Sequence, residues 1–86
     1  LEESGGVTVR QMKIFPVNKL GRFYEHRIKL VVSGHYKNIM KYVKVIKEKE
    51  PTLYWNKMDY KVQKYPFSIV TFYLSIVNDE KYWLST

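Results

Sequence analysis

Histidine and serine side chains are the groups in this sequence that could act in catalysis or hold a metal. His26 and His35 are the two histidines, and neither forms an i,i+4 pair or stands near a set of carboxylates. Zinc would have to combine them with carboxylates, because cysteine is absent. The serines show no nucleophile-elbow motif, and no glycine-rich loop of the phosphate-binding kind exists. We therefore expect no catalytic residue, metal or cofactor, with His26 at the edge of the core and His35 in the first turn of a helix.

The charge of the chain predicts attraction to anions. Fifteen Lys and Arg residues against eight Asp and Glu give a net charge of +7. Such a charge attracts phosphates, anionic lipid or an acidic partner. Twelve of the fifteen cations are lysines, whereas residues that recognise bases or phosphates through two hydrogen bonds are usually arginines. We therefore interpret the charge mainly as a solvated surface.

The uncharged run from Tyr65 to Val77 has thirteen residues, fewer than the roughly 20 that span a bilayer as a helix. Its β-branched and aromatic residues favour a strand from Phe67 to Val77 inside a sheet. Val70, Phe72, Leu74 and Ile76 would face the core, and Ile69, Thr71, Tyr73 and Ser75 the other side. No targeting segment is visible, and the start at Leu1 instead of Met indicates an excised or processed piece.

Four further elements follow from hydrophobic periodicity. A strand at 7–15 shifts its apolar phase after Val9, which predicts a bulge or a bend. A strand at 22–33 alternates cleanly, and 52–63 alternates with frequent charges, as edge strands do. A 3.6-residue period predicts a helix over 34–49, capped by Ser33, with its lysines in solvent.

These elements, in the order (α)-β-β-α-β-β, predict an α+β fold. It would be a circularly permuted ferredoxin-like sandwich, with a four-stranded sheet and one visible helix. Residues 1–6 would be the end of an upstream helix or a linker, and residues 7–86 a single ferredoxin-like domain. The crossover rule predicts that the last strand lies beside the second and parallel to it.

The succession of motifs along the chain resembles the C-terminal domain of MshJ-type proteins. These are relatives of the PilO and GspM components of type IV pilus and type II secretion systems. The matching pieces are Gly34-x-Tyr36, Tyr42-Val43, Leu53-x-Trp55, Tyr65-Pro66 and Trp83-Leu84. The resemblance implies the periplasmic domain of a bacterial inner-membrane protein that is anchored upstream. It also implies no enzymatic activity and a role in the assembly platform.

A protein-interaction domain is the function that we expect from these observations. It would form homodimers or bind sister inner-membrane components of the platform. One helix cannot shield a whole sheet face, so Met12, Ile14, Ile28, Leu30 and Leu74 are expected to be partly uncovered. The candidate interface comprises Val7, Val9, Met12, Ile14, Tyr54, Trp55 and Tyr73.

A basic ferredoxin-like nucleic-acid-binding module is the alternative, because aromatic residues on such a sheet can stack on bases. The expected sequence signature of an RNA-recognition sheet is missing, however. The run "TFYLSIV" also has no basic residue beside its aromatic residues. We therefore expect no nucleic-acid partner.

Overall fold

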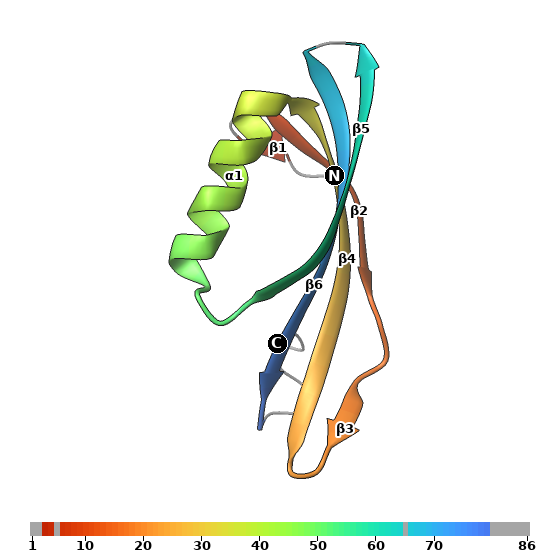
Figure 1. Ribbon diagram of the computed structural model, residues 1–86, viewed down its shortest axis with the longest axis vertical. Coiled ribbons are helices and arrows are strands. Elements are labelled where there is room, and N and C mark those ends of the chain that lie inside the picture. Colours follow the sequence, from red (N-terminus) through yellow and green to blue (C-terminus); the bar gives the residue numbers. More distant parts are fainter. Residues whose placement is uncertain (1–2, 5, 65, 80–86) are drawn as a thin grey trace.

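The computed structural model describes residues 3–4, 6–64 and 66–79, which form an antiparallel sheet with one helix on one face (Figure 1). The strands follow the order β1-β2-β4-β6-β5, and β3 pairs with β4. The α+β class is as predicted, but within the described residues the sheet has six strands instead of four. The elements are β1 (Glu3–Ser4), β2 (Val7–Ile14), β3 (Asn18–Leu20), β4 (Phe23–His35), α1 (Tyr36–Lys49), β5 (Tyr54–Lys64) and β6 (Phe67–Asn78).

Helix α1 forms where the hydrophobic period changes to that of a helix, and its buried Ile39 and Val43 face the sheet. Its lysines at 37, 41 and 44 are exposed, as predicted. The predicted cap was wrong. His35 is the N-cap, and its Nδ1 accepts a hydrogen bond from the backbone N–H of Lys37 at 3.2 Å. Ser33 stays in β4, where its Oγ accepts from Arg10 Nε at 2.9 Å.

Strand β6 lies in the interior of the sheet, as predicted, between β4 and β5. Its alternate residues Val70, Phe72, Leu74 and Ile76 are all buried. Because cross-strand partners share a face, the residues opposite them on β4 also belong to the core. That core face is completed by Ile28, Leu30 and Val32 of β4 and by Val7 of β2.

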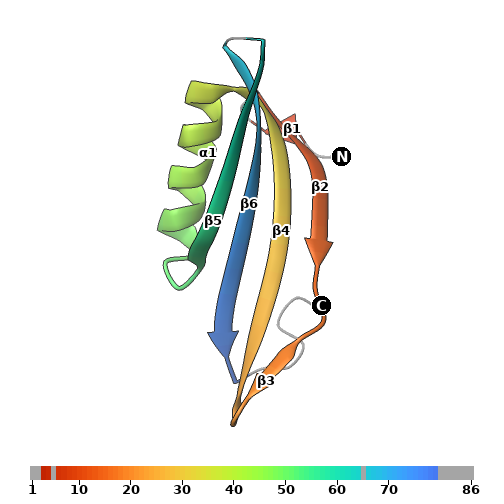
Figure 2. The ribbon, with the colours of Figure 1, turned by 45° about the vertical axis from the view of Figure 1, so that its right-hand side comes forward.

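The predicted direction of β6 was wrong, although its position beside β4 was correct. β6 pairs with β4 antiparallel. Only two residues join β5 to β6, so the chain must reverse there. The crossover through α1 therefore relates β4 to β5, and β6 lies between those two strands (Figure 2).

Strand β2 contains the predicted bulge. Its register with β4 shifts between Val9 and Gln11, which leaves Arg10 as the extra residue. Val9 is opposite Val32 and Met12 is opposite Leu30. The bulge thus keeps Val9 and Met12 on one face. Without the extra residue, two positions three residues apart in a strand would lie on opposite faces.

Two short strands were not predicted. Glu3–Ser4 pair with β2 as strand β1, so the helix end expected at residues 1–6 is wrong for these two residues. Residues 1, 2 and 5 lie outside the described part. Asn18–Leu20, expected in a loop, form β3 and pair with β4. The hairpin between them turns at Gly21, which has a φ of 63°, as the first position of a type II′ turn requires.

Candidate protein interface

The seven residues predicted for an interface lie in three different settings. Val7 is 1% exposed and belongs to the core. Val9 and Trp55 are half-buried against that core. The Trp55 ring packs edge-on against the Phe72 ring, with the two ring centres 5.3 Å apart. These three side chains therefore pack inside the domain. The remaining four, at the surface or half-buried, are Met12, Ile14, Tyr54 and Tyr73.

Met12 and Ile14 stand on the core face of the sheet but are not covered. Their partners in β4, Leu30 and Ile28, are buried, whereas Met12 is 60% and Ile14 is 52% exposed. The expectation of uncovered side chains is confirmed for Met12 and Ile14. It is wrong for Ile28, Leu30 and Leu74, which are 6%, 3% and 5% exposed.

The length of the helix explains this exposure in part. Fourteen helical residues extend about 21 Å, whereas the thirteen residues of β4 extend about 43 Å. Figure 1 accordingly shows α1 beside only the upper part of the sheet. Met12 and Ile14 belong to the lower half of β2, which leads away from the helix. We call Met12 and Ile14 the β2 apolar pair.

The two edges of the sheet differ in how open they are. β5 forms one edge, with two register shifts and the charged residues Lys57, Asp59 and Lys61 exposed. Bulges and charges of this kind discourage pairing with another strand. On the other side, β1 pairs with Val7 and Thr8 only. Among the described residues, no strand pairs with the outer edge of β2 at residues 11–14.

The face opposite α1, here called the open face, includes Tyr54 and Tyr73. An apolar groove of about 490 Å³ lies at its lower end, lined by Phe23, Tyr54 and Val77 together with Pro51 and Thr52. All five of these residues are exposed. Phe23 and Val77 were not predicted as interface residues. Their positions in the alternating pattern could have placed them on the face opposite the core.

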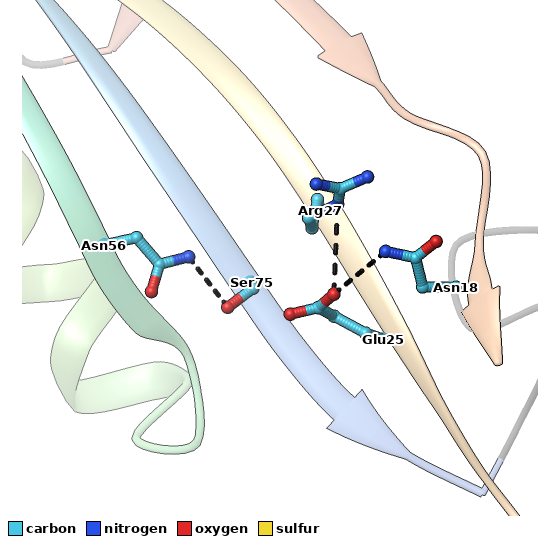
Figure 3. A network of polar contacts seen from close by, with 5 residues as sticks. All are labelled: Asn18, Glu25, Arg27, Asn56 and Ser75. Atoms are coloured by element: carbon cyan, nitrogen blue, oxygen red, sulfur yellow. Dashed lines mark hydrogen bonds and ion pairs between the residues drawn. The ribbon is translucent and has the colours of Figure 1, made fainter. Parts of the chain in front are cut away.

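A polar network lies next to this groove on the open face (Figure 3). Glu25 Oε1 accepts from Asn18 Nδ2 at 3.2 Å and lies 3.9 Å from Arg27 Nε. Asn56, the extra residue at a register shift in β5, donates from its Nδ2 to Ser75 Oγ at 2.9 Å. A cavity of about 220 Å³ opens here, lined by Phe15, Arg27, Asn56 and Tyr73 together with Ile28 and Leu74.

The histidines lie apart and each makes a structural contact. His26 is 2% exposed, and its Nε2 lies 3.2 Å from Asn78 Oδ1, which agrees with the predicted place at the edge of the core. His35 caps α1. Within the described ranges, no three His, Asp or Glu side chains gather in a way that could hold a metal ion. No described helix has the length and apolarity needed to cross a membrane.

Trp83-Leu84, one of the motifs behind the resemblance, lies outside the described residues. Neither a protein-family model, nor a curated protein, nor a solved structure matches the chain.

Proposed function

We propose that this protein is a non-catalytic protein-interaction domain that pairs with copies of itself or with related components of an assembly platform. The observation that supports this function best is the exposure of the β2 apolar pair on the core face of the sheet. Met12 and Ile14 are more than half exposed, and burying such side chains stabilises an association by about 1.5–3 kcal/mol each when burial is complete.

The open backbone edge beside the pair supplies the second element of this interface. Residues 11–14 can extend the sheet by hydrogen bonding to an equivalent segment of another copy, as in other cases of strand addition. An antiparallel arrangement about a two-fold axis uses the same patch twice. The patch is small beside the roughly 800 Å² per partner of a stable complex. We therefore expect a weak dimer that depends on concentration.

The place of this domain in a type IV pilus or type II secretion platform rests on the sequence resemblance. The strand order β2-β4-β6-β5, with α1 between β4 and β5, is compatible with the permuted ferredoxin-like topology of that proposal. The motif residues Gly34 and Trp55 have structural roles that fit it: Gly34 lies where β4 leads into α1, and Trp55 packs on the core. In this proposal the domain is periplasmic and its parent is anchored in the inner membrane.

Sedimentation velocity measurements test self-association. We expect the mean sedimentation coefficient to rise between about 10 µM and about 1 mM, the range of weak interfaces. Changing Met12→Ser together with Ile14→Thr should keep the protein monomeric across that range. The control is Val45→Thr, because Val45 is similarly exposed, at 46%, but lies on α1.

Two outcomes would contradict the proposal. A wild-type protein that stays monomeric throughout would show that the exposed pair does not drive association. A double variant that associates as well as the wild type and the Val45 control would show that association uses another surface. Circular dichroism of each variant establishes that it is folded before its sedimentation is interpreted.

A further inference from the structure

The open face holds most of the net charge of the protein. Among the described residues, cross-strand register places seven cationic residues on it and three acidic ones, Glu3, Glu25 and Asp59, for a net charge of +4 out of +7. Arg10 belongs to this set because it donates to Ser33 of the same face. The cations are Arg10, Lys13, Arg27, Lys29, Lys57, Lys61 and Lys64.

Three of these lysines meet in one row across the sheet. The register sets Lys13 opposite Lys29, Lys29 opposite Tyr73, and Tyr73 opposite Lys57. We call Lys13, Lys29, Tyr73 and Lys57 the basic rung. Like charges directly opposite each other destabilise a sheet. The sequence therefore places a charge cluster where it costs stability in the isolated domain, and an anionic partner would offset that cost.

The carboxylates of the open face do not neutralise the centre of the rung. Glu25 lies 3.9 Å from Arg27, and Asp59 lies 3.8 Å from Lys57. In the described part of the chain, no carboxylate lies within ion-pair distance of Lys13 or Lys29. Their ammonium groups are therefore available to carboxylates or phosphates from another molecule.

The aromatic rings at the rung already have cations over them. Lys13 Nζ lies 5.2 Å from the centre of the Phe15 ring, and the Arg27 guanidinium lies 5.8 Å from it. Lys57 Nζ lies 5.8 Å from the centre of the Tyr73 ring. These contacts hold the cations in place and occupy ring faces that a nucleic-acid base would need for stacking. The rung therefore suits carboxylates better than single-stranded nucleic acid.

The groove beside the rung favours a protein over a lipid surface. The groove is concave and apolar. It has a volume of about 490 Å³, and Phe23, Tyr54 and Val77 are among the residues that line it. A side chain of a protein partner can fill such a hollow, as anchor residues do in interfaces, whereas a flat bilayer surface cannot. Val77 and Tyr73 are four residues apart on β6, which corresponds to about 13 Å.

We infer that the open face binds an acidic protein segment, which places an apolar side chain in the groove and carboxylates on the basic rung about 13 Å away. This inference rests on the proposed role as a protein-interaction domain and names the chemistry of one partner. That partner is not a second copy through the same face, because two surfaces of charge +4 repel each other. Self-association and binding of the acidic segment thus use different faces of the sheet.

A titration of the isotope-labelled domain at low salt, followed through its backbone amide resonances, tests the inference. The probes are the blocked peptide Phe-Ser-Ser-Ser-Glu-Glu, its counterpart with glutamine in place of glutamate, a short oligouridylate, and vesicles of phosphatidylcholine with phosphatidylglycerol. We expect the acidic peptide to shift the amides of Lys29, Tyr73 and Val77. The glutamine peptide should leave them unchanged.

Charge-removing variants identify the surface. Changing Lys13→Gln together with Lys29→Gln should weaken binding of the acidic peptide about fivefold. Each substitution removes one ion pair between a lysine and a peptide carboxylate, and a partly exposed ion pair contributes only a modest binding free energy. Lys41→Gln with Lys44→Gln on α1 is the matched control, because both side chains are exposed and the charge change is equal. That control should change the affinity less than about twofold.

Several results would overturn the inference. They are equal weakening by both double variants, no shift with the acidic peptide, or tighter binding of oligouridylate or vesicles at the rung. Its failure differs from failure of the proposed function. Lys29→Gln alone, which lies on β4 and outside residues 11–14, should leave the concentration dependence of sedimentation unchanged. A protein that forms the dimer but does not bind the peptide would therefore contradict the acidic partner and not the proposed function.

Discussion

Phe72→Asp will leave the protein largely unfolded at 25 °C. Phe72 is 2% exposed at the centre of β6, and its ring packs edge-on against Trp55. Losing a buried phenylalanine side chain costs about 3–5 kcal/mol, and a buried carboxylate without a partner adds several more. The total stability of a domain of this size is about 4–13 kcal/mol. Far-ultraviolet circular dichroism and thermal melting measure the loss.

Met58→Asp provides the matched control for that prediction. Met58 lies directly opposite Phe72 on β5 and shares its face, but it is 52% exposed. The same new carboxylate there remains hydrated, so we expect a loss of about 1 kcal/mol. If Phe72→Asp melts cooperatively at the temperature of Met58→Asp, then β6 is not the centre of the core.

Gly34→Ala should destabilise the domain by about 3 kcal/mol or more, from backbone strain and a steric clash together. Gly34 has a φ of 150°, a conformation that a side chain disfavours. An added Cβ would lie 2.5 Å from the backbone oxygen of Gly6, so β2 and β4 would have to move apart where Val7 pairs with Gly34. A loss of this size lowers the melting temperature of a small domain by about 12–24 °C.

Gly21→Ala separates the clash from the effect of positive φ. Gly21 has a φ of 63°, but an added Cβ there would meet no atom within 4 Å. Its cost should therefore be only the about 1–2 kcal/mol of a left-handed alanine. Equal melting temperatures for the two alanine variants would show that the close approach of Gly34 to Gly6 does not stabilise the fold.

Much of the fold could be predicted because the decisive signals are local. Strand β6 could be predicted from its β-branched residues. Helix α1 could be predicted from apolar residues that repeat with a period of 3.6 residues as far as Pro51. The bulge at Arg10 also left a trace, since apolar residues changed phase between Val9 and Met12. In each case, neighbours in the sequence determine which side chains share a face.

Other features depend on partners distant in the sequence and left no comparable signal. Strand β3 consists of three residues, all exposed, so it shows no alternation of apolar and polar side chains. It is a strand because it pairs with β4. The prediction of Ser33 as the helix cap followed residue preference, but Arg10 from the neighbouring strand holds that hydroxyl group in the sheet. The direction of β6 depended on recognising that α1 connects β4 to β5, with β6 between them.

The candidate sites show the same limit. The sequence of β6 has no basic residue near Tyr73, yet cross-strand pairing supplies Lys29 from one side and Lys57 from the other. Exposure of Met12 and Ile14 could be predicted from the shortness of one helix. Burial of Ile28 and Leu74 could not, because it depends on how the side chains of the whole core face pack.

Amide hydrogen exchange at two protein concentrations tests most directly whether the domain associates through β2. We expect the outward amides of residues 11–14 to exchange more slowly at about 1 mM than at about 10 µM, because pairing with a second copy protects them. The amides of β5 should exchange at the same rate in both samples. Protection confined to β5, or identical exchange along β2 at both concentrations, would contradict the proposed interface.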